Sequence, residues 1–406
     1  MEERDLRLLE HVAIRNITTM DYKVWNELQL TGAMFRNDYP VLSELSRILK
    51  DKNKYMLSER TVIRLEDAVN NVDKVKKAVD DYIYVMERSD IKVVSRSDYH
   101  YPKNWSELSG MPSVFFAKGN LGVLDEVTYN GAAAIVGSRD PGRYSLYATK
   151  EFAQKLARKH VVIVSGLALG IDRKAHETCL DSGGATVAIV PGGIDIVYPY
   201  QNRDIYDRIC ENGLLVSEMP PGQPVIKQYF PSRNRLISAL SDVCLIMEAG
   251  MFSGTLHTAS FAASQGKDVF VLPNSIYCKN SIGGLMLLRD GAEVLIDEDA
   301  VLDRIYNAVN NRRMEIEASM DNAVYRGELE IEGLRELAKE HPDELDESDW
   351  KHIVCDEISE RPKNIDEICT SLGIPFSFLS ALITNLETDG KIANEKGKYV
   401  LTIHGR

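Results

Sequence analysis

The chain has 406 residues, of which 44% are hydrophobic and 27% are charged. This length corresponds to two or three ordinary domains, and the composition excludes collagen-like, mucin-like and wholly disordered chains. The formal net charge of −13, taken alone, argues against a polyanionic partner such as a nucleic acid.

The acidic charge is concentrated in one segment of the chain. Residues 293–361 hold 21 acidic and 8 basic side chains, which accounts for the whole excess of −13. Residues 131–292 are slightly basic, with 16 Lys or Arg against 14 Asp or Glu. The charge of residues 131–292 therefore does not exclude a nucleic-acid partner for this part of the chain.

The amino-terminal residues have no basic stretch followed by an apolar one, so they do not read as a signal peptide. No apolar run approaches the roughly 18 residues of a membrane span. We therefore expect a cytoplasmic protein that contacts no membrane. The six cysteines are scattered without a CxxC pair, which is typical of buried thiols rather than of a metal or redox site.

Residues 1–90 alternate charged and apolar side chains with helical spacing, as in Leu42, Leu45, Ile48 and Leu49. This spacing predicts a small helical domain of the SAM-like kind. From residue 91 to about 124 the chain is irregular and rich in proline and glycine, which indicates a connecting lobe with a strand at Ser113–Ala117.

Short apolar runs then alternate with helical stretches, and continuous apolar runs indicate parallel strands that are buried on both faces. The runs are Ala132–Val136, Val161–Val164, Thr186–Val190, Leu214–Val216, Val243–Met247, Val269–Leu272 and Val294–Ile296. The predicted fold class is α/β, with a Rossmann-like, doubly wound and mostly parallel sheet over residues 91–310, entry lobe included. Such sheets bind ligands at the carboxyl ends of their strands.

Residues 311–349 form an acidic linker with little apolar periodicity, which we expect to be solvated and partly mobile. Residues 350–406 show three helical stretches and two short strands, the pattern of a winged helix. The third stretch, Phe376–Asp389, contains no Lys or Arg, whereas Lys391, Lys396 and Lys398 lie in or near the wing. This distribution favours protein binding or regulation over reading of a major groove.

Four strand ends carry residues suited to anions. Gly137 permits close backbone approach after the first strand, and Arg139 adds a charge that can bind phosphate in a bidentate manner. Gly166 and Gly170 follow the second strand and could form an anion-binding nest that Asp172 orients. Each feature has an alternative interpretation as an ordinary turn or helix cap.

The segment from Lys227 to Arg235 combines three cations with two adjacent aromatic residues. Such a combination grips phosphates while a ring stacks on a base, although a solvated basic turn would look similar. A further strand end places Ser253-Gly254-Thr255 at a helix entrance, where amides and hydroxyls can meet an oxyanion. The predicted phosphate- and DNA-binding residues are Gly137, Ser138, Arg139, Ser165, Gly166, Gly170, Lys227, Phe230, Arg233, Asn234, Arg235, Ser253, Gly254 and Thr255.

Sequence patterns of hydrolytic enzymes are absent: there is no GxSxG, HExxH or Walker pattern. We interpret His176 as a packed or capping histidine rather than a general acid or base. The sequence therefore favours binding over catalysis, and we predict neither a metal nor a cofactor.

Taken together, these motifs resemble the bacterial DNA-processing protein DprA (Smf) family. The match runs from Tyr101-Pro102 to Gly291-Ala292 and departs from the family pattern at Asn274, where Gly is usual, and at Leu285, where Asn is usual. The matching motifs are Gly137–Arg139, Ser165–Asp172, Gly193–Asp195 with Tyr198-Pro199, Ser217-Glu218, Phe230–Arg235, and Ser253–Thr255 with Thr258-Ala259.

The resemblance implies a non-catalytic protein that binds single-stranded DNA, forms a homodimer and loads a RecA-type recombinase. The setting it implies is natural transformation or other DNA recombination. Carried over by position, the DNA contacts would be Arg139, the loop Ser165–Gly170, Lys227, Phe230, and Arg233 with Arg235.

An alternative is a nucleotide-binding or nucleotide-hydrolysing enzyme of the LOG type, which the glycine-lined sheet also resembles. Those enzymes carry a PGGxGTxxE signature. Here Pro191-Gly192-Gly193 is followed by Ile194-Asp195, and the helix after Thr255 has no Glu in its next turn.

Overall fold

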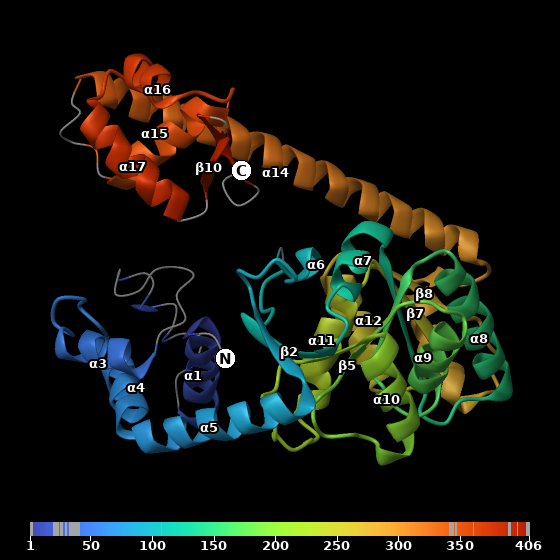
Figure 1. Cartoon of the computed structure of the whole chain (residues 1–406). Coiled ribbons are helices and arrows are strands. Elements are labelled where there is room, and N and C mark those ends of the chain that lie inside the picture. The colour runs from blue at the N-terminus through green and yellow to red at the C-terminus, as the bar shows by residue number, and fades with distance from the viewer. Residues whose placement is uncertain are drawn as a thin grey trace. The chain divides into compact units, whose positions relative to one another are not determined.

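A computed structural model describes residues 3–18, 24, 27, 28, 31, 41–106, 108–340, 345, 347–359, 361–388, 391–395 and 397–402 (Figure 1). The chain divides into two compact units, Met1–Arg312 and Arg313–Arg406. Lys396 and the residues Glu360 and Asp389 at predicted helix ends lie outside the described residues.

The start of the chain is helical, as predicted. Its described helices are α1 (Glu3–Ile17), α3 (Leu42–Lys50), α4 (Glu59–Asn70) and α5 (Val72–Ser89). Ser58 caps α4 by accepting a hydrogen bond from the Thr61 amide, because a serine oxygen replaces the missing helical acceptor. The apolar faces of these helices share one core with Phe116 and Ile205 at one side of the sheet.

The first unit contains a nine-stranded sheet in its described residues, ordered β1-β2-β6-β5-β4-β3-β7-β8-β9. The strands are β1 (Ile91–Ser95), β2 (Val114–Gly119), β3 (Ala132–Gly137), β4 (Val162–Ser165), β5 (Thr186–Ile189), β6 (Leu214–Ser217), β7 (Val243–Glu248), β8 (Asp268–Val271) and β9 (Glu293–Val294). All neighbours from β6 to β9 pair in parallel, whereas β1 and β2 are antiparallel additions.

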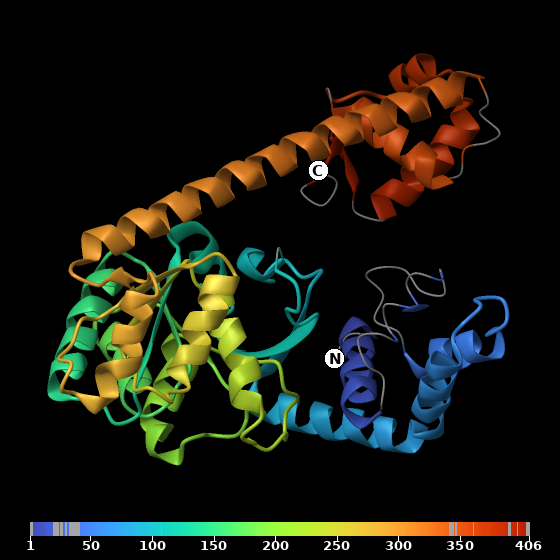
Figure 2. The same cartoon turned by 180° about the vertical axis from the view of Figure 1, so that it is seen from behind.

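Helices cover both faces of this sheet, so the predicted doubly wound α/β fold is confirmed. Figures 1 and 2 view the molecule from opposite sides, and helices lie in front of the sheet in both. One core layer joins α11 and α12 to the strands, and the other joins α8, α9 and the start of α14. The helices and 3-10 turns are α6 (Lys103–Ser106), α7 (Val123–Asn130), α8 (Arg143–Arg158), α9 (Ile171–Asp181), η1 (Tyr200–Asn202), α10 (Arg203–Asn212), α11 (Tyr229–Leu240), α12 (Thr255–Ser264), η2 (Lys279–Ser281) and α13 (Ile282–Arg289).

Every predicted strand is present within two residues of its expected bounds. The strand β1 was not predicted, because its sequence Ile-Lys-Val-Val-Ser lies in a stretch that reads as irregular. Its register with β2, from Ile91 opposite Lys118 to Ser95 opposite Val114, depends on a pairing partner some 20 residues away. Local patterns do not report such a pairing.

The chain order of the strands reverses at β3. From β3 the chain proceeds outward to β4, β5 and β6, then crosses to β7 on the other side of β3 and continues to β8 and β9. Loops that leave β3 and β7 diverge at this switch point, which is where open α/β sheets place a ligand crevice. A ligand is therefore expected at the carboxyl end of the sheet.

The acidic segment is helical along most of its length. Helix α14 spans Glu298–Glu340, a run of 43 residues, through most of the predicted linker 311–349. Its sequence is rich in Glu, Leu, Arg and Ala, which have high helix propensity. The prediction of a solvated, partly mobile segment is based on the lack of apolar periodicity there, which does not prevent residues of high helix propensity from forming a helix.

Within the second unit, three helices and a two-stranded antiparallel ribbon follow in the predicted order. They are α15 (Glu347–Ser359), α16 (Ile365–Leu372), α17 (Phe376–Thr388), β10 (Ile392–Glu395) and β11 (Lys398–Leu401). Their core holds Trp350, Ile353, Ile368 and Leu382. The winged-helix interpretation of these elements stays a prediction.

Candidate nucleic-acid interface

A carboxylate of the protein itself lies at the switch point between β3 and β7. Oε2 of Glu248, at the end of β7, accepts hydrogen bonds from the Gly142 amide at 3.0 Å and from the Ser145 hydroxyl at 2.7 Å. Glu248 is only 4% exposed. Because this carboxylate caps the amino terminus of α8, that terminus is not available to a phosphate.

The turn after β3 leaves one cation in solvent. Arg139 is exposed, whereas Gly137 and Ser138 are half-buried. A side chain at position 137 would collide with Ile171, whose nearest atom would lie 2.6 Å from the added Cβ. Gly137 is thus required by packing against α9, and Arg139 is the residue of this turn that reaches outward.

The loop after β4 is held from inside by Asp172. Oδ2 of this buried carboxylate accepts hydrogen bonds from the amides of Gly166, at 3.1 Å, and Ala168, at 3.4 Å. Gly170, with a φ of +79°, packs on the backbone of Ser138. The predicted anion nest therefore already contains an anion, and Ser165 is buried with its hydroxyl donating to the Ile135 carbonyl.

Arg233 lies inside the fold, beneath the same loop. Its guanidinium donates to the carbonyls of Gly166, at 2.6 Å, and Ile189, and the side chain is 6% exposed. An added Cβ on Gly166 would lie 2.5 Å from this guanidinium, so the glycine makes room for the arginine.

Burial sets the protonation of the groups around Arg233. Burial lowers the pKa of Arg233 to about 10, and it raises the pKa of Asp172, which the nearby Arg233 partly offsets. His176 is also buried, and burial lowers its pKa to about 3. Its Nδ1 lies 2.7 Å from the Thr186 hydroxyl, which itself donates to the Ile163 carbonyl. His176 is thus a packed neutral histidine, as the sequence analysis interprets it.

Above this buried layer, cations and aromatic rings meet at the surface. The Arg139 guanidinium stands 5.2 Å from the centroid of the Phe230 ring, and Arg233 stands 6.0 Å from it. Tyr198, 43% exposed, contacts Phe230 edge-on with ring centroids 5.9 Å apart. Lys227, three residues before Phe230, is exposed. The structure thus brings Arg139, Lys227 and Phe230 into one neighbourhood of the surface.

The remaining residues of the segment are engaged within the protein. Arg235 donates to Glu218 at 2.6 Å, and both side chains are less than one-fifth exposed. Asn234 accepts from Nε of Arg233 and donates to the Gly254 carbonyl at 3.4 Å. The Ser253 hydroxyl accepts from the Thr255 amide at 3.2 Å, so part of the α12 entrance is capped locally.

The predicted residues therefore separate into an exposed and an inward-facing group. Arg139, Lys227 and Gly254 are exposed and Phe230 is half-buried, whereas Ser165, Gly166, Arg233 and Thr255 are buried. Tyr198, Glu218 and Glu248 are additional residues of this edge. A carboxylate directly after a buried apolar strand, as at Glu248, is a signal that the sequence analysis could have used.

The Pro191-Gly192-Gly193 turn is covered by the chain that follows β6. The Gly193 amide donates to the Gln223 carbonyl at 2.8 Å, and the Gly222 amide donates to Asp195 at 2.8 Å. In the LOG-type alternative such a turn offers its amides to a nucleotide phosphate. Here the Gly193 amide already has a partner within the protein.

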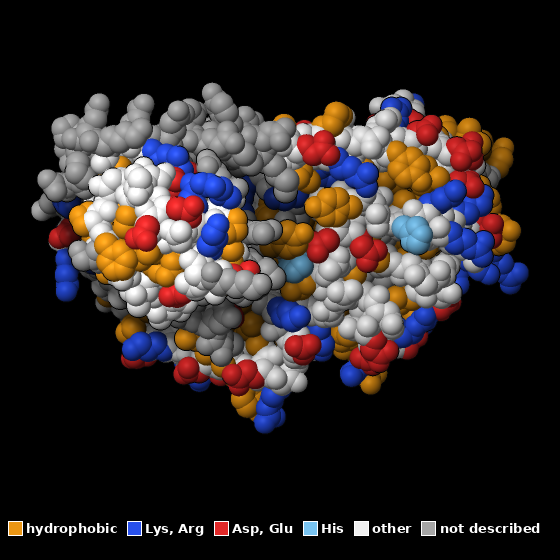
Figure 3. Space-filling model, turned by 45° about the horizontal axis from the view of Figure 1, so that its top comes forward, with side chains coloured by type: hydrophobic (Ala, Val, Ile, Leu, Met, Phe, Trp, Pro, Cys, Tyr) orange, Lys and Arg blue, Asp and Glu red, His pale blue; other side chains and the backbone are white. Residues whose placement is uncertain are grey.

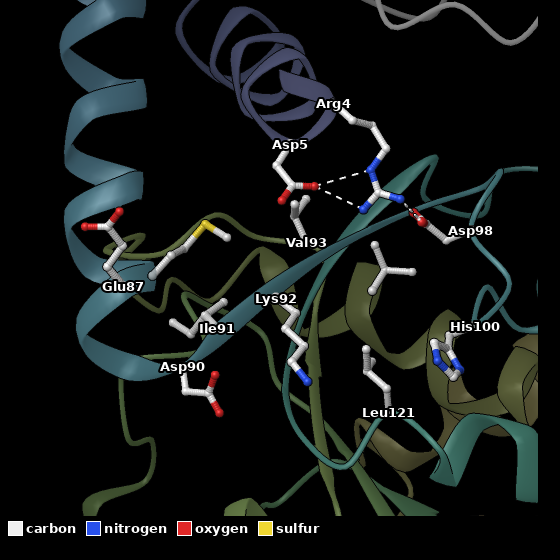
Figure 4. A pocket seen from close by; sticks show the side chains of 12 residues that line it. Arg4, Asp5, Glu87, Asp90, Ile91, Lys92, Val93, Asp98, His100 and Leu121 are labelled. Carbon is white, nitrogen blue, oxygen red and sulfur yellow. Dashed lines mark hydrogen bonds and ion pairs between the residues drawn. The ribbon is translucent and has the colours of Figure 1, made fainter. Parts of the chain in front are cut away.

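A hollow of about 470 Å³ lies at β1, beside the ends of α1 and α5 (Figure 4). Arg4 is part of its lining and forms ion pairs with Asp5 at 3.0 Å and with Asp98. Carboxylates outnumber cations in its lining, and it holds none of the predicted site residues. This hollow is therefore not the predicted anion site.

Acidic and basic side chains are mixed on one face of the molecule. Figure 3 shows Lys, Arg, Asp and Glu side chains interspersed on the face in view, without a continuous basic surface among its described residues. The described part of the chain holds no group of three or more His, Cys, Asp or Glu placed to bind a metal ion. In that same part, every helix is too short or too polar to cross a membrane.

Comparison with known proteins gives the family. A model of the DNA recombination-mediator protein A family matches residues 92–306, more than half of the chain. The chain belongs to this family. The matched range contains the whole sheet apart from the first residue of β1, and it includes every predicted site residue.

Relatives and a solved structure agree with this assignment. Protein Smf of Synechocystis is 33% identical over 74% of this chain and 77% of its own length. DNA processing protein DprA of Streptococcus pneumoniae is 38% identical over 50% of this chain and 70% of its own length. The crystal structure of DprA from S. pneumoniae superposes with a TM-score of 0.55 at 31% identity, covering 71% of this chain and 99% of that one. The chain thus has the DNA-processing, recombination-mediator role of its family.

Proposed function

We propose that the protein binds single-stranded DNA without catalysis and, as a homodimer in the cytoplasm, loads a RecA-type recombinase onto it. The observation that carries the binding step is the grouping of Arg139, Lys227 and Phe230 at the carboxyl end of the sheet. Two exposed cations suit a phosphate backbone, and the nearby Phe230 ring suits an unpaired base. The setting would be natural transformation or other DNA recombination.

The buried layer supports this assignment by shaping the exposed one. Arg233 and Asp172 fix the loop after β4, and the ring of Phe230 lies over Arg233. A ring held in place before binding loses little freedom when a base stacks on it. The carboxylates that a hydrolase would need near its substrate, Asp172 and Glu248, are here engaged with the protein's own amides.

Binding should depend on salt and on strandedness. Each phosphate neutralised contributes about −0.7 to the slope of log affinity against log salt, so Arg139→Ala and Lys227→Ala should each flatten the slope by about that amount. Fluorescence anisotropy with a labelled oligonucleotide and its duplex measures both effects. Arg158→Ala, an exposed arginine at the far end of α8, is the matched control.

Equal affinity for the single strand and the duplex would contradict the proposal, and so would unchanged affinity in both variants. The folded state is checked by urea unfolding, which neither substitution should alter by more than about 0.5 kcal/mol.

Mediator activity requires its own assay. Recombinase filaments should assemble faster, once this protein is added, on single strands already coated by a single-strand-binding protein. Light scattering coupled to gel filtration tests the dimer. No acceleration of filament assembly by a protein that binds the strand would restrict the function to binding.

The LOG-type alternative is tested separately by incubation with nucleoside monophosphates. Because Gly193 and the α8 terminus are engaged within the protein, we expect no released base.

A further inference from the structure

Two loops near the proposed DNA site expose large apolar side chains. Phe252, in the loop after β7, is 97% exposed, and Tyr277, in the loop after β8, is 90% exposed. Their neighbours Met251 and Ile276 are 50% and 67% exposed. Grouped apolar side chains on a surface mark a binding surface, because exposing them to water is unfavourable.

The two loops form one platform. The Gly284 amide, in α13, donates to the Ala249 carbonyl at 3.0 Å. A Cβ on Gly250 would lie 3.6 Å from the Lys279 carbonyl, and a Cβ on Gly283 would collide with the Gly250 backbone. The close backbone packing of the two loops therefore holds Phe252 and Tyr277 on a common support.

This platform adjoins the proposed DNA site on two sides. The Asn280 amide group donates to the Asp140 carbonyl at 3.1 Å, which joins the loop after β8 to the turn that carries Arg139. Asn234, on the same helix as Phe230, donates to the Gly254 carbonyl, two residues from Phe252. A strand bound at Arg139 and Phe230 thus has a continuous surface towards Phe252.

The charge of the platform also suits a phosphate backbone. Lys279, in the loop after β8, is exposed, and so are Asp140 and Arg143 in and after the turn that Asn280 contacts. Tyr144 and Tyr147, on α8, are 52% and 65% exposed. Aromatic rings interleaved with cations are the composition of tracks that bind single strands by stacking, whereas an apolar protein partner would leave the cations unused.

We propose that Phe252 and Tyr277 are base-stacking residues that extend the track for the same single strand beyond Phe230, towards β8. This inference rests on the proposed function and adds a second group of nucleotides to it. The ligand is the continuation of the bound strand, so the platform contributes only when the strand is long enough to reach it.

Two lengths of oligothymidylate separate the platform from the primary site. A strand of about 4 nucleotides covers only the neighbourhood of Phe230, and one of about 15 nucleotides reaches both. The double variant Phe252→Ala/Tyr277→Ala should bind the long strand roughly 30-fold or more weakly, since each stacked ring strengthens binding by about fivefold or more. Its affinity for the short strand should not change.

The matched control is Tyr306→Ala, which removes a ring that is 43% exposed on α14; it should leave both affinities unchanged. Phe252→Trp supplies a direct readout, because an indole that stacks on a base loses fluorescence. We expect quenching by the long strand and little by the short one.

The outcomes distinguish this inference from the proposed function. If Lys227→Ala weakens binding at both lengths while the double variant binds both normally and Phe252→Trp is not quenched, only the platform is overturned. Normal DNA binding by the double variant with lost self-association or lost recombinase binding would assign the platform to a protein partner. If the unaltered protein binds neither strand, both the proposed function and the proposed role of the platform are contradicted.

Discussion

The two ends of the parallel sheet each bury one arginine, and they use it differently. At the amino end, Arg312 of α14 forms an ion pair with Asp242 at 2.7 Å and also donates to Asn104 at 2.7 Å. At the carboxyl end, Arg233 donates to the carbonyls of two strand ends instead, and Asp172 accepts amides.

The Arg312–Asp242 pair anchors the fold, whereas Arg233 also supports the residues that we propose to bind DNA. Both members of the Arg312–Asp242 pair make further hydrogen bonds within the protein. Asp242 accepts one from the Ala132 amide, and Arg312 donates to two further carbonyl groups. The Arg233 layer instead has exposed residues above it, Arg139, Lys227 and Phe230. Losing Arg312 should therefore affect folding alone, whereas losing Arg233 should affect folding and binding together.

The largest expected effect is that of Arg312→Met. Removing one partner of a buried pair leaves the other charge uncompensated, which costs about 3–5 kcal/mol. Urea unfolding should show this loss, and the folded fraction should bind DNA normally. Arg158→Met, on an exposed arginine, is the control. A loss below about 1 kcal/mol would mean that the amino-end pair is not an anchor.

Arg233→Met should destabilise the protein by about 2–4 kcal/mol, because two buried carbonyls lose their donor and Asp172 loses its facing cation. DNA affinity should fall as well, since the loop after β4 and the Phe230 ring lose their support. Unfolding and anisotropy titrations on one preparation measure both. Arg139→Met should lose only affinity; if it also lost stability, the division between buried and exposed arginines would be wrong.

His176 makes the folded protein sensitive to acid. Its pKa is about 3 in the folded protein and about 6.5 in an unfolded chain. As the pH falls below 6.5, the His176 imidazole takes up a proton in the unfolded state but not in the folded state, so the free energy of unfolding decreases. Between pH 7 and pH 5 this group should cost about 2 kcal/mol. Urea unfolding at pH 7 and pH 5 should show that the free energy of unfolding changes by about 2 kcal/mol less in His176→Asn than in the unaltered protein. An equal pH dependence in both proteins would contradict the assignment.

The smallest effect concerns Arg235, which Glu218 neutralises at the edge of the site. Glu218→Gln removes the carboxylate charge and should strengthen binding of single-stranded DNA about twofold at low salt, with the gain vanishing at high salt. Anisotropy titrations at two salt concentrations measure this. Weaker binding would show that Arg235 needs Glu218 to hold its position.

The sequence by itself determined the fold class, and it predicts a binding site at the glycine-rich strand ends. Apolar runs such as Val243–Met247 are long enough to identify strands buried on both faces, and glycine-rich ends locate the turns. Both signals lie within short stretches of sequence, so they can be recognised without the tertiary structure. Strand β1 carries apolar residues but lies in a stretch that reads as irregular, and the helical continuation of α14 lacks apolar periodicity.

Only the tertiary structure decided which predicted side chains face solvent. Lys227, Arg233 and Arg235 are equivalent cations within one short segment of sequence, yet one is exposed, one is buried and one is paired with Glu218. Their environments come from β4, β5 and β6, which are distant along the chain. Burial and ion pairing depend on those distant contacts. Sequence alone therefore could not distinguish the buried, supporting cations from those on the proposed binding surface.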